Sequence, residues 1–130
     1  MKPTQLGIKI IRIILGVILL VFGLNHFFQF MPMPQPPEPA MNFMGALTAT
    51  GFMWSLIGIV QVISGIFLII GRYVALGLVL FAPVALVILL HHIFLDPAGG
   101  LIGYITFILE VLLLYAYLGA YKPMLQQKAE

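Results

Sequence analysis

The sequence predicts an all-α fold: a four-helix transmembrane bundle with both termini cytoplasmic, and with a Pro/Met-rich outer loop and a short interfacial helix between helices one and two. The composition, four long apolar runs and the one-sided placement of the basic residues support this prediction. Of the 130 residues, 62% are hydrophobic and 8% are charged. Because a soluble domain carries roughly 25% charged residues, this composition indicates a chain that lies in lipid. The length predicts a single transmembrane domain over residues 1–130.

Four apolar runs are long enough to cross a bilayer, since a helical span requires about 20 apolar residues. The predicted spans are residues 6–28, 51–70, 73–94 and 101–121. Gly71 and Arg72 alone join the second and third spans, which predicts a tight antiparallel hairpin. Pro97 ends the third helix at or before Asp96, because a residue that precedes proline is disfavoured in helical geometry. Only the first connection is long.

The basic residues predict the orientation. They lie at the start of the chain, in the second connection and at the C-terminal end: Lys2, Lys9, Arg12, Arg72, Lys122 and Lys128. The other two connections carry Glu38 and Asp96 and contain no lysine or arginine. By the positive-inside rule, both termini and the Arg72 turn are expected in the cytoplasm.

The long connection is rich in proline and methionine. Its prolines predict an extended path without internal hydrogen bonds: Pro32, Pro34, Pro36, Pro37 and Pro39. Asn42 is expected to cap a short helix over residues 43–50, which Gly51 ends. Five methionines lie in or near this connection: Met31, Met33, Met41, Met44 and Met53. Thioethers can bind Cu(I), but adaptable packing is favoured, because prolines interrupt the tract and no histidine joins it.

Small and polar residues mark the inward face of a membrane helix, because lipid is as apolar as leucine. They recur at helical spacing on three spans: Arg12, Gly16, Gly23 and His26; Gly51, Trp54, Gly58, Gln61 and Gly65; Gly103, Thr106, Glu110 and Tyr117. The third span adds Gly77, Pro83 and the pair His91-His92. A spacing near 3.5 predicts a left-handed bundle in which glycines bring the backbones close together.

The inward polar groups are expected at two depths. Gln61, Glu110 and Arg12 lie near the midplane and in the inner half, and a second group lies near the outer end: Asn25, His26, Gln29, His91, His92 and Asp96. An acid at the centre of a membrane costs at least ~2.5–3.5 kcal/mol. Glu110 is therefore expected to be paired or neutral. The alternatives are a structural ion pair with Arg12, a hydrogen bond to Gln61, and a proton or ligand site.

The histidines permit several interpretations. His26 and one of His91 or His92 could ligate a haem, and Asp96 could complete a metal site. No C-x-x-C-H or dense ligand motif supports either, so no metal is predicted and haem is disfavoured. His92 and Asp96 are i, i+4 neighbours, an arrangement in which a carboxylate orients an imidazole. A mixed aromatic and polar pocket at this depth favours a quinone headgroup or a polar lipid group.

The predicted ligand-binding residues are Asn25, His26, Gln61, His91, His92, Asp96 and Glu110. Several other classes of function are excluded. The chain has no cysteine, which excludes disulfides, thiol redox chemistry and cysteine-bound metals. The net charge of +2 is small and its basic residues are scattered, so no nucleic-acid surface is expected. No nucleophile elbow, phosphate loop or H-E-x-x-H motif supports hydrolysis or phosphoryl transfer.

Three segments carry a resemblance to a known family: GLNHFFQFMP, NFMGALTATG and HHIFLDPAG. In this order they resemble bacterial DoxX-family membrane proteins. The resemblance implies a multi-pass four-helix bundle in the bacterial cytoplasmic (inner) membrane with cytoplasmic termini. It also implies links to quinone-dependent sulfur oxidation and to oxidative-stress complexes. Other members of the superfamily are cargo receptors or receptor-assembly chaperones, so the resemblance leaves open whether the chain is an enzyme.

Two hypotheses follow. In the first, the chain is a small redox-associated subunit that binds a quinone-like or lipidic ligand between the helices near the outer face. In the second, it is a non-catalytic assembly or interaction protein that docks a membrane protein partner through the outer Pro/Met loop. A homo-oligomer is also possible. A transporter or channel is less favoured, because no inverted repeat is evident. No catalytic residue is carried over from the family.

Overall fold

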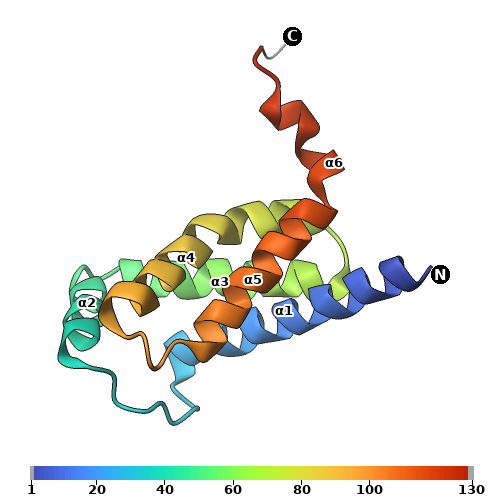
Figure 1. Cartoon of the computed structure of the whole chain (residues 1–130). Coiled ribbons are helices and arrows are strands. Elements are labelled where there is room, and N and C mark those ends of the chain that lie inside the picture. The colour runs from blue at the N-terminus through green and yellow to red at the C-terminus, as the bar shows by residue number, and fades with distance from the viewer. Residues whose placement is uncertain (1, 129–130) are drawn as a thin grey trace.

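A computed structural model describes residues 2–128, and this part of the chain contains helices and no strand (Figure 1). The α-helices are α1 (Pro3–Phe28), α2 (Glu38–Ala49), α3 (Met53–Ile70), α4 (Val74–Leu95), α5 (Leu101–Ala116) and α6 (Leu118–Tyr121). A 3-10 helix, η1 (Lys122–Leu125), follows α6. The predicted all-α class is confirmed.

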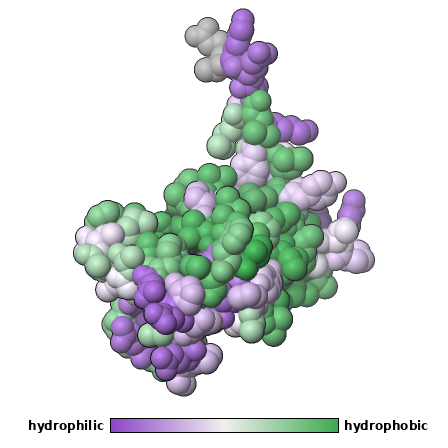
Figure 2. Space-filling view, turned by 60° about the vertical axis from the view of Figure 1, so that its left-hand side comes forward, coloured by the Kyte–Doolittle hydropathy of each residue, from purple (hydrophilic) through white to green (hydrophobic). Residues whose placement is uncertain are grey.

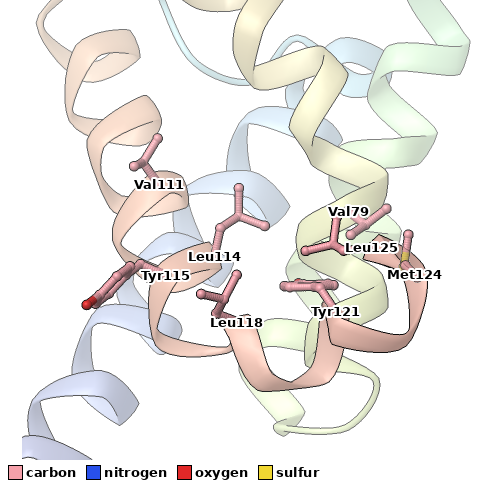
Figure 3. Close-up of a pocket in the computed structure, with 8 residues that line it drawn as sticks. All are labelled: Val79, Val111, Leu114, Tyr115, Leu118, Tyr121, Met124 and Leu125. Carbon is pink, nitrogen blue, oxygen red and sulfur yellow. The ribbon is translucent and has the colours of Figure 1, made fainter. Parts of the chain in front are cut away.

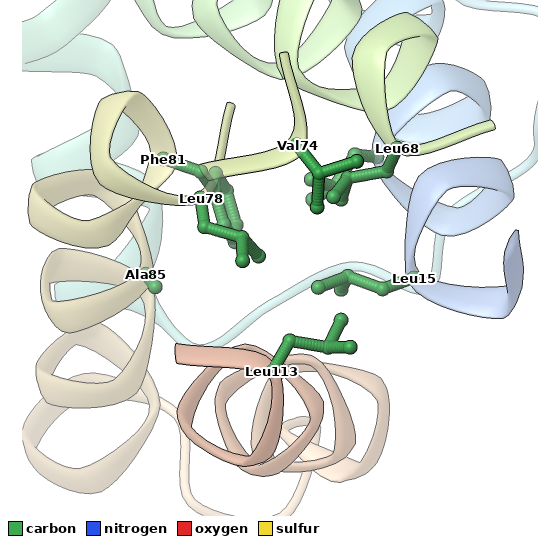
Figure 4. Close-up of a cluster of buried hydrophobic side chains, with 8 residues drawn as sticks. Leu15, Leu68, Val74, Leu78, Phe81, Ala85 and Leu113 are labelled. Carbon is green, nitrogen blue, oxygen red and sulfur yellow. The ribbon is translucent and has the colours of Figure 1, made fainter. Parts of the chain in front are cut away.

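Helices α1, α3, α4 and α5 form the bundle. Helix α1 packs on α3, α3 on α4, α4 on α5, and α5 on α1, which closes the ring. Buried apolar side chains from all four helices meet inside it (Figure 4): Leu15, Leu19, Leu68, Val74, Leu78, Phe81, Ala85 and Leu113. The flank of the bundle is largely hydrophobic, and hydrophilic side chains gather towards its ends (Figure 2). This distribution is typical of a bundle surrounded by lipid.

Three of these helices, α1, α3 and α4, are long and apolar enough to cross a membrane by themselves. Helix α5 passes the same test only together with α6 and η1, from which it is separated by a bend of 72°. The described chain therefore has three candidate spans, or four if the bent pair is one span.

Glycines set the close approach of α1 to α3. A Cβ atom added at Gly65 would lie 2.8 Å from the carbonyl oxygen of Gly16, and one added at Gly23 would lie 3.0 Å from the backbone nitrogen of Val62. The predicted inward stripes are confirmed for most of their members, which are buried: Gly16, Gly23, Gly58, Gln61, Gly65, Gly77, Gly103, Thr106 and Glu110. Gly51 and Pro83 are exposed instead.

The helix in the long connection begins earlier than predicted. Helix α2 starts at Glu38, and Asn42 lies inside it rather than capping it. Pro39 is compatible with this start, because the first turn of a helix leaves its N–H groups unpaired and a missing N–H costs little there. The carboxylate of Glu38 also complements the positive end of the helix dipole. The non-helical connection is therefore residues 29–37, and its prolines lie at 32, 34, 36 and 37.

The predicted fourth helix, residues 101–121, is broken at Tyr117. The bend is stabilised by Tyr121, whose hydroxyl donates a 2.8 Å hydrogen bond to the carbonyl of Ala75 in the first turn of α4. Gly119, which follows the bend, has open space around the position of its Cβ. The bend encloses an apolar groove of about 420 Å³, between Val79, Val111 and Met124 among others (Figure 3).

The two ends of the bundle differ in chemistry. We call one the loop end: the ends of α1 and α4, the starts of α3 and α5, and α2, which packs on α3 and α4. We call the opposite end, with Lys9, Arg12 and Arg72, the basic end.

Candidate functional site

At the loop end, His26 and Trp54 form one aromatic pair. Their ring centroids are 4.2 Å apart, and the indole Nε1 of Trp54 donates to the carbonyl of His26 at 3.3 Å. The Nδ1 atom of His26 lies 3.0 Å from the carbonyl oxygen of Phe22, one turn earlier. The absence of a side chain at Gly58 makes room for the pair, since a Cβ added there would lie 2.8 Å from the Cβ of His26. The pair joins the end of α1 to the start of α3.

His91 and His92 form a second group with α2 and α5. The ring of His91 lies 5.5 Å from that of Phe43 on α2 and 5.0 Å from that of His92, measured between centroids. The Nδ1 atom of His91 is buried and has no hydrogen-bond partner. His92 packs on α5, where its Nε2 would lie 2.8 Å from a Cβ added at Gly103. In the described residues, no hydrogen bond or ring contact joins His26 to this group.

The carboxylate of Asp96 does not orient His92. The Nδ1 atom of His92 lies 3.3 Å from the main-chain oxygen of Asp96, whereas the carboxylate Oδ1 accepts a hydrogen bond from the backbone N–H of Gly99 at 3.1 Å. This is a local turn interaction, since the short side chain of an aspartate readily accepts a hydrogen bond from a backbone N–H two or three residues further along the chain. In the described chain, Asp96 thus shapes the turn between α4 and α5.

Asn25 also has a local structural role. Its Oδ1 accepts a 3.0 Å hydrogen bond from the backbone N–H of Met31. Between them, Gln29 adopts the left-handed conformation with a φ of 49° and ends α1. Asn25 therefore anchors the start of the non-helical connection by its hydrogen bond to Met31. The chain leaves the bundle at Gln29.

A second set of polar side chains is buried inside the bundle. Its four members, on α3 and α5, are at most 4% exposed: Gln61, Ser64, Thr106 and Glu110. Thr106 donates a 2.7 Å hydrogen bond to the carbonyl of Ile102 within its own helix. Both carboxylate oxygens of Glu110, the Oε1 of Gln61 and the Oγ of Ser64 have no partner. Buried polar groups are normally paired, so this unsatisfied set is a candidate binding site for a polar group or a proton.

The four side chains come from two helices. Gln61 and Ser64 lie on one face of α3 and Thr106 and Glu110 on one face of α5, because residues three or four apart share a helix face. Both Gln61 and Glu110 lie near the middle of their helices. Sequence reasoning found three of the four members and missed Ser64. Its i+3 spacing from Gln61 and its position next to Gly65 were the available signals.

Arg12 does not form a hydrogen bond with Glu110 in the described chain, since both carboxylate oxygens are unpartnered. Its guanidinium instead lies at the turn between α3 and α4, where a Cβ added at Gly71 would be 3.0 Å from Nη2. The aliphatic part of the Arg12 side chain can stay in the apolar region while its charged group reaches the basic end of the bundle. The acid and the base therefore lie in different environments.

In residues 2–128, no group of three or more His, Cys, Asp or Glu side chains is placed to hold a metal ion. The candidate site has two parts: aromatic and imidazole groups at the loop end, and buried polar side chains of α3 and α5 deeper in the bundle. Such a combination suits an amphipathic molecule with hydrogen-bonding oxygens.

One comparison with known proteins gives a match. The family model of DoxX matches residues 7–93, from the first turns of α1 to the last turn of α4. No curated protein and no solved structure matches the chain.

Proposed function

The chain belongs to the DoxX family of membrane proteins, and from this premise we propose that it is a small redox-associated subunit that binds a quinone-like or lipidic ligand at the loop end. In this proposal the membrane is the bacterial inner membrane, the loop end faces outwards and both termini are cytoplasmic. The ligand lies between the helices, and its polar group lies near the histidines. Glu110 and Gln61 lie deeper along the bundle.

The observation that carries the proposal is the free nitrogen of His91. Its Nδ1 is buried without a partner, and its ring lies between those of Phe43 and His92. An unpaired buried nitrogen costs free energy, about 1–3 kcal/mol. A ligand oxygen that bonds to this nitrogen would remove that cost, and the neighbouring rings would stack on a flat headgroup. Both features fit a quinone.

The surroundings of His91 support an amphipathic ligand. Helix α2 covers this end of α3 and α4, and its Ala40 is fully buried. On the lipid side of α4, Phe94 is 75% exposed and Leu90 is 43% exposed. A polar headgroup beneath α2 would therefore leave its apolar tail along a surface that already faces lipid.

The test is a binding titration on protein in lipid nanodiscs. Trp54 is the sole tryptophan, so quenching of its emission by a short-chain quinone reports binding. His91→Phe keeps an aromatic ring and removes the nitrogen, and we expect it to weaken binding about tenfold. Tyr115→Phe is the control, because this residue is 78% exposed on α5. An affinity in His91→Phe equal to that of the unsubstituted protein would refute the proposal.

A lipidic ligand is distinguished from a quinone in the same titration. A saturated alcohol of the same chain length has the tail without the ring. If the alcohol raises the thermal stability of the protein as much as the quinone does, the site recognises the tail, and the ligand is lipidic. If only the quinone does so, the ring is recognised.

A second candidate function is docking of a membrane protein partner through the extended segment. Phe30 and Met33 are 53% and 60% exposed there, and the few hydrogen bonds of this segment include that from Met31 to Asn25. Replacing residues 32–36 with a Gly/Ser linker leaves α2 intact. Loss of a co-purified partner, without loss of quinone binding or thermal stability, would favour docking.

A further inference from the structure

A groove with basic side chains in its lining lies at the basic end, between α1 and the end of α5. It has a volume of about 450 Å³ and is lined by Gln5, Ile8, Lys9, Arg12, Ala116 and Tyr117. Gln5, Lys9 and Arg12 share one face of α1, since their positions differ by three, four or seven, and Ile8 borders this face. This groove lies at the opposite end of the bundle from the site proposed above.

The groove is cationic and short of acceptors. Its lining includes Lys9 and Arg12 and no carboxylate. The Nε of Arg12 is buried without a hydrogen-bond partner. The Oε1 of Gln5 accepts a 3.1 Å hydrogen bond from the backbone N–H of Lys2, which leaves its amide N–H groups as donors. A site with two cations, free donors and no acid is complementary to an anion with several oxygens.

The position of the groove indicates where the anion comes from. The guanidinium of Arg12 lies against Gly71, in the turn that joins α3 to α4, and such turns lie near the membrane surface. Lys9 is three residues nearer the N-terminus, so its side chain lies nearly one turn further towards water. The two charges are therefore at the depth of lipid headgroups.

The bend after α5 keeps the groove open. Helix α5 ends at Ala116, and the following segment leaves at 72°, so it does not cover the first turns of α1. With 16 residues, α5 is about 24 Å long, which is shorter than the hydrocarbon core of a typical bilayer at about 30 Å. If α5 alone spans the bilayer, the phosphates next to its end would lie at the level of the groove.

We propose that this groove binds the headgroup of an anionic phospholipid. The planar guanidinium of Arg12 donates to the phosphate oxygens, for which its fork of N–H groups is suited. Lys9 supplies the second positive charge, and Gln5 and Tyr117 donate to the remaining headgroup oxygens. Basic pockets between membrane helices bind anionic lipids by the same chemistry.

The experiment compares thermal unfolding in nanodiscs of phosphatidylcholine alone and of phosphatidylcholine with phosphatidylglycerol. We expect phosphatidylglycerol to raise the unfolding temperature, because a ligand that binds only the folded state stabilises it. The double variant Lys9→Gln/Arg12→Gln is expected to lose this shift. Arg72→Gln removes an exposed cation at the same end but outside the groove, and it is expected to keep the shift.

Three outcomes would overturn the proposal. They are an equal unfolding temperature in both lipids, an equal loss of the shift in Arg72→Gln, and the same shift produced by inorganic phosphate in phosphatidylcholine nanodiscs. The last would identify a free anion as the ligand. If the double variant does not fold, Arg12→Lys replaces it. That variant keeps the positive charge but lacks the planar N–H donors of the guanidinium. We expect a smaller shift in unfolding temperature and less phosphatidylglycerol retained in native mass spectrometry.

Discussion

Trp54 and His26 are joined twice, by a ring contact of 4.2 Å between centroids and by a 3.3 Å hydrogen bond from the indole to the main-chain oxygen of His26. His26 lies in the last turn of α1 and Trp54 in the first turn of α3, and the long connection runs between them in sequence. The pair therefore brings the two ends of that connection together, and the extended segment and α2 lie between these ends in sequence.

Replacing His26 with leucine removes the ring contact and leaves the main-chain acceptor in place. We expect a loss of about 0.5–1.5 kcal/mol in stability, the usual contribution of an aromatic pair. The emission maximum of Trp54 is expected to shift, because its nearest ring is lost. Phe28→Leu is the control, since Phe28 is on the same helix and 71% exposed. Identical emission spectra for all three proteins would contradict the contact.

Gly65→Ala is expected to destabilise the bundle by about 1–3 kcal/mol, the usual cost of overpacking. Its Cβ would lie 2.8 Å from both the carbonyl oxygen of Gly16 and the backbone nitrogen of Leu20, and backbone atoms cannot move aside alone. Gly7→Ala is the matched control, because Gly7 is in α1 and has open space around it. Thermal unfolding in detergent measures both, and we expect Gly7→Ala to be neutral or stabilising by up to about 1 kcal/mol.

Glu110→Met is expected to raise stability by about 1–3 kcal/mol, because an apolar side chain of similar size replaces a buried carboxyl group whose oxygens have no partner. Leu113→Ala, one turn along α5 and also fully buried, is expected to lower stability by about 2–5 kcal/mol. This control shows that the assay detects core changes. A clear loss of stability in Glu110→Met would instead mean that the carboxyl group has a stabilising partner, such as a bound cation or Arg12.

The orientation can be tested with single cysteines, since the chain has none. Glu38 and Arg72 are exposed at the loop end and the basic end. In intact cells, a membrane-impermeant maleimide is expected to label Glu38→Cys at once and Arg72→Cys only after the membrane is permeabilised. The reverse pattern would place the loop end in the cytoplasm and remove the outward-facing site from the proposal.

Part of the candidate site was predictable from the sequence. Glycine and polar residues at helical spacing indicated that Gln61, Thr106 and Glu110 point inwards, and all three are buried. The partners of the polar side chains were not predictable. His92 lies near the main-chain oxygen of Asp96 rather than its carboxylate, and Arg12 lies against Gly71 rather than hydrogen-bonded to Glu110. Sequence spacing places a residue on a face, but a flexible side chain then selects among several acceptors within its reach.

By itself, the sequence determined the all-α class, the apolar helices and their inward faces, because these depend on composition and on the helical period. It also determined the family. Only the tertiary structure decided where α2 begins and which helices it covers, and that α5 ends at Ala116. These features depend on contacts between residues far apart in the chain, such as the hydrogen bond from Tyr121 to Ala75 and the ring contact of Phe43 with His91. Local preferences are weak there, so packing between the helices determines the outcome.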